Sequence, residues 1–445
     1  MTLMSKSFAA RWERKGIRSR QYGGWVINSV ENRIAGKKPT SEKKQNGKKT
    51  IVWYGIPAYG HTCSNLFLAD ALAKMGFRVL YYSMAPFREM IEANGCEYRA
   101  YPVLKKLPDL SDGKRILKLY RLLLEYTRNM LPSLLQEAER NTPCCVIFES
   151  LALWGRAVGF LRGIPSFSFY SIVAVRKVGE SAFFEYGMGF WADFWRYIGE
   201  IPKAVSVRRQ LKQNYGLPDL GLLPVLMNSG DYNLMGYTAH FQPDGKKFGK
   251  EYRFLGPLSA HRTVTETNDF TCPGGTLIYV SLGTIFHEDK RLLEELIKQF
   301  GEAGEEPIYK IVMVTGEEGK DEDKDACVAS LPANFIGRPF VNQLEILKRA
   351  SLFISAGGMN SIHEALWCGV PCLLYPQQGE QLVNARRFEQ MGFGRILKRI
   401  ARLRAEAERA MQLRYTWDET LRAEMTAVHM EDVLSLFRRW QEGQK

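Results

Sequence analysis

A pair of glycines between an apolar run and a polar, helix-forming stretch is the part of this chain best suited to bind an anion. The apolar run Ser351–Ser355 is typical of a buried parallel strand, and the glycines Gly357 and Gly358 follow it almost at once. We expect a helix next, capped by Asn360 or Ser361. Such a turn presents unpaired N–H groups and the positive end of a helix dipole, which suits a diphosphate. The alternative is an ordinary strand–helix turn, with glycine present for close packing.

Polar side chains that could orient a ligand surround this turn. They are Gln343 before the strand, Asn360, Ser361 and Glu364 after the glycines, and Glu380, Gln381 and Asn384 after the next strand. Because the carboxyl ends of parallel strands meet at one edge of a sheet, we expect these groups to converge there. Glu364, one turn into the helix, is placed to accept hydrogen bonds from a ribose diol.

A histidine follows the first apolar strand of the chain, Ile51–Tyr54, at the edge where such sheets bind ligands. This residue, His61, is predicted to lie on a loop. An imidazole has a pKa near neutrality and suits proton transfer from a hydroxyl group. A structural or merely exposed histidine is the alternative.

The elements that must position these groups alternate between strand and helix. After the first strand we expect a helix over 64–75 and a strand over 78–82, and the pattern repeats with a strand over 277–280, a helix over 290–300 and a strand over 308–314. This alternation predicts doubly wound parallel sheets. Pro and Gly punctuation between residues 237 and 270 predicts a hinge between two such sheets.

One ordered set of motifs is more specific than any of these features alone. Residues 332–384 contain PxNFxxRxFVxQ, GGMNSxxEAL and GVPxLxxPQxxEQxxNA, and GxPAxGH surrounds His61. The set resembles the nucleotide-sugar-binding signature of GT-B glycosyltransferases, in particular the UDP-dependent family typified by bacterial macrolide glycosyltransferases and plant natural-product glucosyltransferases. The resemblance implies an α/β GT-B fold, with two Rossmann-like doubly wound parallel-sheet domains facing a central cleft.

The resemblance also implies roles for individual residues. His61 matches the histidine that deprotonates the acceptor hydroxyl, and Glu149 matches the carboxylate that holds it, where most relatives carry Asp. Ser150 could join that relay, while a carboxylate capping the next helix is the alternative for Glu149. The residues matching the family's donor site are Gly60, Gly283, Thr284, Phe340, Val341, Gln343, Ala356, Gly357, Gly358, Asn360, Ser361, Glu364, Glu380 and Gln381.

Two of these positions depart from the family pattern. Ala356 stands where relatives carry a histidine that contacts the diphosphate, and Phe340 stands where a tryptophan stacks on uracil. Phenylalanine keeps an aromatic face. Alanine removes a hydrogen-bond donor near the leaving group.

The function that the resemblance implies is an inverting transfer of a hexose from a UDP-sugar, with UDP-glucose as the default. The acceptor is a hydroxyl of a small hydrophobic molecule such as a macrolide, polyketide or flavonoid, and neither a bound cofactor nor a metal is expected. The aromatic residues Phe183, Phe184, Tyr186 and Phe190 match the acceptor region, although core packing or shallow contact with lipid would explain them too. The alternatives are a peripheral-membrane glycolipid-forming enzyme and a catalytically weak sugar-nucleotide-binding partner protein.

Five segments are predicted along the chain. They are a basic, disordered extension over 1–48, an acceptor-binding domain over 49–245, a linker over 246–270, a nucleotide-sugar-binding domain over 271–412, and a helix over 413–445 that crosses back to the first domain.

Charge and composition limit which other partners, compartments and sites we expect. The 445 residues carry a net charge of +13, of which residues 1–50 hold +10 through thirteen Lys and Arg against three Glu. Such a basic arm could bind weakly to an anionic membrane surface. The alternative is a solvated extension with no binding role. We expect no nucleic-acid partner. The eight cysteines lack paired metal spacing and read as reduced thiols. We therefore predict a cytoplasmic monomer or dimer without a membrane-spanning helix.

Overall fold

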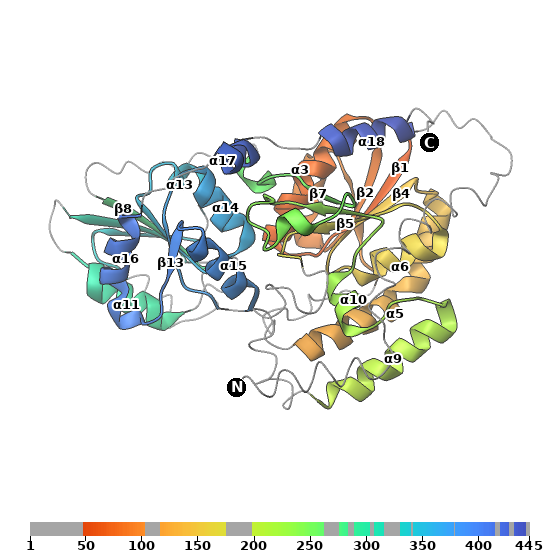
Figure 1. Ribbon diagram of the computed structural model, residues 1–445, viewed down its shortest axis with the longest axis horizontal. Coiled ribbons are helices and arrows are strands. Elements are labelled where there is room, and N and C mark those ends of the chain that lie inside the picture. Colours follow the sequence, from red (N-terminus) through yellow and green to blue (C-terminus); the bar gives the residue numbers. More distant parts are fainter. Residues whose placement is uncertain are drawn as a thin grey trace. The chain divides into compact units, whose positions relative to one another are not determined.

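The chain folds into two sheets whose strands are all parallel (Figure 1). The structure, a computed structural model, describes residues 48–102, 116–174, 198–261, 276–283, 289–302, 307–315, 330–339, 341–377, 379–413, 419–426 and 431–441. The predicted class of two doubly wound parallel sheets is confirmed. The basic extension predicted over 1–48 lies outside the described residues apart from its last position.

The first sheet contains seven strands in the order β3-β2-β1-β4-β5-β6-β7. They are β1 (Thr50–Tyr54), β2 (Arg78–Ser83), β3 (Glu97–Ala100), β4 (Cys145–Glu149), β5 (Ser166–Tyr170), β6 (Tyr232–Met235) and β7 (Tyr252–Phe254). Strands β1, β4 and β5 are rich in β-branched and aromatic residues and are buried throughout, as strands covered on both faces are. The strand order reverses its direction between β1 and β4.

The second sheet contains six strands in the order β10-β9-β8-β11-β12-β13. They are β8 (Thr276–Ser281), β9 (Tyr309–Val314), β10 (Phe335–Arg338), β11 (Leu352–Ser355), β12 (Cys372–Leu374) and β13 (Gly394–Ile396). Its order reverses between β8 and β11. In open α/β sheets such a reversal opens a crevice at the carboxyl ends of the two strands, and ligands bind there.

Helices separate the strands in both halves. In the first half they are α3 (Tyr59–Lys74), α4 (Arg88–Ala93), α5 (Ile116–Asn141), α6 (Leu153–Arg162), α9 (Glu200–Tyr215) and α10 (Leu222–Met227). In the second half they are α11 (Lys290–Phe300), α13 (Gln343–Leu347), α14 (Met359–Trp367), α15 (Gly379–Gln390), α16 (Leu403–Met411), α17 (Glu419–Thr426) and α18 (Glu431–Gln441). Short 3₁₀ turns lie at Ala85–Phe87, Gly245–Lys247, Leu258–His261 and Ile400–Arg402.

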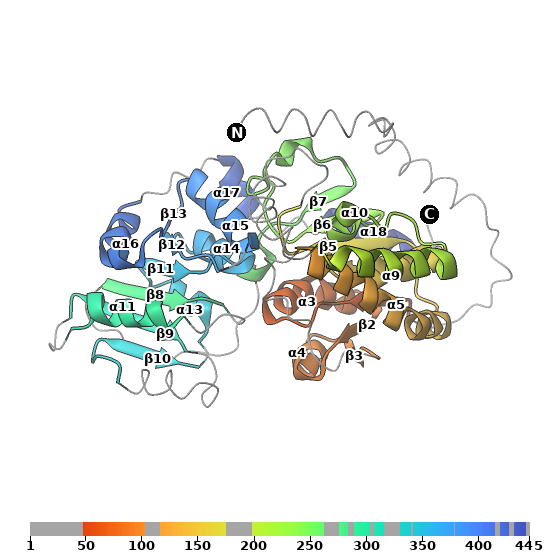
Figure 2. The same cartoon turned by 90° about the horizontal axis from the view of Figure 1, so that it is seen from below.

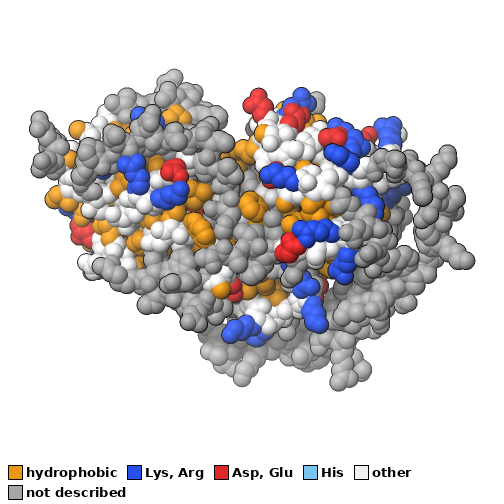
Figure 3. Space-filling view, turned by 90° about the horizontal axis from the view of Figure 1, so that it is seen from above, with side chains coloured by type: hydrophobic (Ala, Val, Ile, Leu, Met, Phe, Trp, Pro, Cys, Tyr) orange, Lys and Arg blue, Asp and Glu red, His pale blue; other side chains and the backbone are white. Residues whose placement is uncertain are grey.

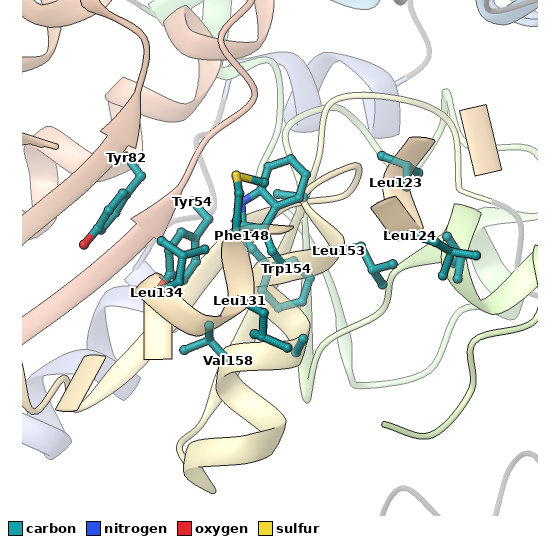
Figure 4. Close-up of a cluster of buried hydrophobic side chains, with 14 of the residues drawn as sticks. Tyr54, Tyr82, Leu123, Leu124, Leu131, Leu134, Phe148, Leu153, Trp154 and Val158 are labelled. Atoms are coloured by element: carbon teal, nitrogen blue, oxygen red, sulfur yellow. The ribbon is translucent and has the colours of Figure 1, made fainter. Parts of the chain in front are cut away.

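One face of the first sheet packs on α5, α6, α9 and α10 through a large apolar cluster. Helices α5 and α9 lie side by side in both views (Figures 1 and 2). Figure 4 shows Trp154 of α6 among Phe148, Leu131 and Leu153. Its indole N–H donates to Tyr101 Oη at 3.2 Å, and Tyr101 in turn donates to the Gly55 carbonyl at 2.8 Å. This core therefore holds the turn that leads from β1 to α3.

The other face of the first sheet is covered by α3, α4 and the last helix, α18. The ring of Phe437 in α18 lies 5.0 Å from Phe167 of β5 and 5.9 Å from Phe77, measured between centroids. The chain thus returns to the first sheet after completing the second. In the second half, α11 and α16 cover one face of the sheet, while α13, α14 and α15 cover the other.

One observation adjusts the expected layout. Strand β7 (Tyr252–Phe254) pairs with β6 in the first sheet, so the segment 246–270 that we predicted as a linker still contributes to that sheet. On the face seen in Figure 3, Lys and Arg side chains are spread among hydrophobic and uncharged ones. Among the helices of the described ranges, none has the length and apolar composition needed to cross a bilayer.

Candidate active site

His61 lies at the reversal point of the first sheet, where β1 and β4 are neighbours. It is the third residue of α3, because the helix begins at Tyr59 and the Thr62 amide already donates to the Ala58 carbonyl at 2.9 Å. The prediction that His61 lies on a loop, with the helix starting near residue 64, is therefore wrong. Gly60 adopts the helical conformation and does not delay the helix.

The predicted pairing partner of His61 lies directly beside it. Glu149 is the last residue of β4, and its Oε1 is 2.7 Å from His61 Nδ1. The carboxylate is completely buried, whereas 19% of the histidine side chain is exposed. Ser171, the residue after β5, has its Oγ 2.9 Å from the same nitrogen and hydrogen-bonds to the same carboxylate oxygen. The carboxylate thus orients the ring by its Nδ1 side.

The environment of His61 changes how tightly the imidazole holds a proton. Burial lowers its pKa, but the charge and the hydrogen bond of Glu149, together with the charge of Glu380, outweigh burial and raise the pKa of His61 to about 9. Glu380 lies in the first turn of α15, and burial raises its own pKa. An imidazole with a raised pKa is a stronger base once it has lost its proton.

The second reversal point carries two matching turns. Ser281 and Ser355 end the neighbouring strands β8 and β11 and are paired in register. Each is followed two residues later by a glycine with positive φ, Gly283 at 91° and Gly357 at 85°. The Gly357 amide donates to Ser355 Oγ at 3.2 Å and the Gly283 amide to Ser281 Oγ at 3.4 Å. Both glycine amides therefore already have a partner.

The helix after the second of these turns begins differently from our prediction. Gly358 is its N-cap, and neither Asn360 nor Ser361 caps it with a side chain. A glycine N-cap leaves the first-turn amides of α14 without partners inside the helix. Asn360 instead donates from Nδ2 to the carbonyl of Gly60 at 2.6 Å, which joins α14 to the residue before His61.

The remaining polar residues form two small networks. Glu364, which is buried, accepts from Gln343 Nε2 at 2.7 Å, and Tyr279 donates to Gln343 Oε1 at 3.2 Å. Near the turn, Asn384 donates to the Gly357 carbonyl at 3.1 Å, and Gln381 Oε1 accepts from the Gln377 amide at 2.8 Å. These contacts fix side chains that the sequence assigned to ligand binding.

Two further predicted donor residues are buried. Val341 is 4% exposed, and Ala356 is 2% exposed within the apolar cluster that includes Val280 and Leu282. Thr284, Phe340 and the acceptor residues Phe183, Phe184, Tyr186 and Phe190 lie outside the described residues. In the part of the chain that the structure describes, no group of three or more His, Cys, Asp or Glu could hold a metal ion.

Sequence reasoning missed three features of this site. One is Ser171, which meets Glu149 because β4 and β5 are neighbours. The others are the Asn360–Gly60 hydrogen bond and the serine–glycine contacts of the two turns. The turns left a readable signal, since Ser-Leu-Gly and Ser-Ala-Gly repeat the same spacing after two apolar strands.

The structure thus has two doubly wound parallel sheets, each with a reversal of strand order, and this is an architecture of the GT-B kind. One reversal point carries the histidine–carboxylate pair, and the other carries a glycine turn at a helix N-terminus. Comparison with known proteins agrees. Residues 274–431 match the family described as Glycosyltransferase family 28 C-terminal domain. The chain is 26% identical over 361 residues to the uncharacterized UDP-glucosyltransferase YojK of Bacillus subtilis, a match that covers 78% of this chain and 85% of that protein.

Two more comparisons extend the picture. Oleandomycin glycosyltransferase of Streptomyces antibioticus is 23% identical over 363 residues, covering 78% of this chain and 79% of its own. The solved structure of the glycotransferase of kitacinnamycin superimposes with a TM-score of 0.70 at 21% identity, covering 89% of this chain and 100% of its own. Residues 274–431 thus match a glycosyltransferase family, the chain as a whole is similar to proteins named UDP-glucosyltransferase and oleandomycin glycosyltransferase, and its fold is that of the GT-B glycosyltransferases.

Proposed function

We propose that this chain moves a hexose, glucose by default, from a UDP-sugar to a hydroxyl group of a small hydrophobic natural product such as a macrolide, polyketide or flavonoid. The observation that carries this proposal is the pair at the first reversal point, with His61 Nδ1 2.7 Å from the buried Glu149 carboxylate. This contact leaves the other ring nitrogen, Nε2, to face an acceptor.

The reaction is a single displacement. Nε2 of neutral His61 takes the proton of the acceptor hydroxyl while its oxygen attacks the anomeric carbon, and the bond from that carbon to the diphosphate breaks. Attack opposite the leaving group inverts the anomeric configuration. Glu149 stabilises the imidazolium that forms.

The leaving group is a nucleoside diphosphate with developing negative charge. We assign its binding to the amide of Gly358, the amides of the first turn of α14 and the dipole of that helix, with Thr284 as a further donor. These groups supply the stabilisation without a divalent metal. Ser355 competes for the Gly357 amide, so that amide contributes once the serine hydroxyl turns away.

Five of the other predicted donor residues take part in donor binding in this proposal. Glu364 and Gln343 face the ribose, Glu380 and Gln381 face the sugar hydroxyls, and Phe340 stacks on the base. Phe183, Phe184, Tyr186 and Phe190 line the acceptor pocket in this proposal.

The test is turnover of isotope-labelled UDP-glucose with a panel of phenols and macrolides, in parallel with dTDP-glucose. Two structural neighbours are described in complex with thymidine diphosphates, which makes that donor the informative comparison. We expect His61→Ala to lower transfer by about 10²–10⁴-fold, the usual contribution of a general base.

The matched control is His240→Ala. His240 contacts its neighbours through its backbone, whose amide donates to Glu424 and whose carbonyl accepts from Arg387, and alanine keeps both bonds. Full transfer by His61→Ala would refute the base assignment. Binding of UDP-glucose by the wild type, without transfer to any acceptor, would favour a sugar-nucleotide-binding partner protein.

A further inference from the structure

Ser171 is the polar group closest to the His61–Glu149 pair that the sequence did not assign to the site. It follows β5 directly, is 7% exposed, and lies beside the end of β4 because Glu149 is paired in register with Phe169. Its Oγ is 2.9 Å from His61 Nδ1 and hydrogen-bonds to Glu149 Oε1. One hydroxyl thus contacts both members of the pair.

The direction of these hydrogen bonds follows from the chemistry of the groups. Nδ1 is 2.7 Å from a carboxylate oxygen, so it carries a hydrogen and donates. The Ser171 hydroxyl cannot donate to a nitrogen that is itself a donor, and it therefore donates to Oε1. That oxygen accepts two hydrogen bonds, whereas Oε2 of Glu149 has no partner among the described residues.

We propose that the Ser171 hydroxyl is a positioning group that acts on His61 through Glu149: it donates to Oε1, draws negative charge from that oxygen and so weakens its attraction for the Nδ1 proton. This inference rests on the proposed role of His61 as the base.

Three titratable groups face this arrangement. Glu149 comes from β4 and Glu380 from α15, and both attract the imidazolium. Tyr81, on β2, is buried and feels the charge of Glu149. Serine carries no charge, so its influence on His61 acts through the hydrogen bond to Oε1. That bond withdraws negative charge from the oxygen that attracts the Nδ1 proton.

Removing the hydroxyl should therefore raise the pKa of His61. A hydrogen bond to a charged group is worth about one to two pKa units, and His61 feels only the part of it that differs between its two protonation states, which we set at about one unit. Well below the pKa, each unit lowers the fraction of neutral imidazole tenfold. We expect Ser171→Ala to reduce transfer about tenfold at pH 7, to leave the acceptor KM unchanged, and to match the wild type at a pH above both pKa values.

The experiment uses the full chain in two measurements. The first is the pH profile of kcat/KM for transfer. The second is an NMR titration of the His61 ring, assigned by comparison with His61→Ala, which needs no turnover. We expect Ser171→Ala to raise the apparent pKa in both, and Ser171→Thr, which keeps the hydroxyl, to restore the wild-type value.

The matched control is Ser150→Ala. Ser150 adjoins Glu149 and is fully buried, and its Oγ has no hydrogen-bond partner among the described residues. It therefore does not join the relay considered for it from the sequence, and its loss should not move the titration. Ser171→Cys keeps the shape and donates weakly, and should shift the pKa in the same direction if the alanine variant fails to fold.

Two results would overturn the inference. One is an unchanged or lowered pKa of His61 in Ser171→Ala or Ser171→Cys, and the other is an equal shift in Ser150→Ala. Absence of transfer by the wild type would contradict the proposed function instead, and the NMR titration would still decide the role of Ser171.

Discussion

His61 binds its proton more tightly than a free histidine, and this has opposite consequences for activity and stability. Its pKa in the folded protein is about 9, against about 6.5 in an unfolded chain. In its proposed role as a base His61 must be neutral to act, so the active fraction should grow as the pH rises. The ion pair with Glu149 stabilises the fold only while the imidazole is protonated. This contribution is complete below pH 6.5 and is lost as the pH rises through 9.

The prediction at this scale couples the two effects. Between pH 7 and 9, kcat/KM should rise while the free energy of unfolding falls. The wild type should exceed His61→Ala in stability by roughly 2–3 kcal/mol at pH 6, since one pKa unit corresponds to about 1.4 kcal/mol. Urea unfolding of both proteins at pH 6 and 9.5 measures this. A gap that persists at pH 9.5 would mean that packing, not the ion pair, accounts for the difference.

In the turn after β11, the two glycines Gly357 and Gly358 are required for different reasons. Gly357 has a φ of 85°, and a Cβ added there would lie 3.1 Å from the Gln381 carbonyl oxygen. Gly358 has an ordinary φ of −62° and open space where its Cβ would be. The first glycine is required by the backbone, whereas the second is required only if a ligand approaches closely.

Single alanine substitutions separate these two requirements. We expect Gly357→Ala to destabilise the fold by about 1–2 kcal/mol, the cost of a left-handed conformation for a residue with a side chain. Gly358→Ala should leave the melting temperature unchanged but weaken UDP binding, because its methyl group would occupy the space proposed for the diphosphate. Thermal melts and UDP calorimetry on both variants test this. Unaltered UDP affinity in Gly358→Ala would place the diphosphate elsewhere.

At the scale of the whole molecule, the sequence predicts topology better than side-chain contacts. Alternating strands and helices were enough to predict two parallel sheets, because that pattern depends on local periodicity. The contact between Ser171 and Glu149 depends on the register of β4 against β5, which local sequence does not encode. Helix α3 begins at Tyr59, before the predicted start near residue 64, because Gly60 adopts the helical conformation. Thr284, Phe340 and the four acceptor aromatics stay predictions.

The Asn360–Gly60 hydrogen bond links helix α14, in the second half of the chain, to helix α3, in the first. Asn360 was predicted to bind the donor, yet its Nδ2 donates at 2.6 Å to the carbonyl of the residue before His61. If a bound donor displaces this amide, the hydrogen bond that fixes the backbone next to His61 is lost. If the donor leaves the amide in place, that backbone is already fixed before the donor binds. The effect of removing the amide distinguishes these arrangements, since only the second makes Asn360 important for catalysis and unimportant for donor affinity.

We predict the second arrangement. Asn360→Ala should lower kcat about fivefold, the value of one neutral hydrogen bond of about 1 kcal/mol, and leave the Kd for UDP within a factor of two. Ser361→Ala is the comparison, because Ser361 is the next residue of the same helix and accepts a hydrogen bond from Gln343 Nε2; as a predicted donor residue it should weaken UDP binding without slowing turnover at saturating donor. Calorimetry with UDP and initial rates at saturating donor supply the two numbers. If Asn360→Ala weakens UDP binding as much as it slows turnover, then the side chain binds the donor in the active enzyme, and its bond to Gly60 belongs to the empty state alone.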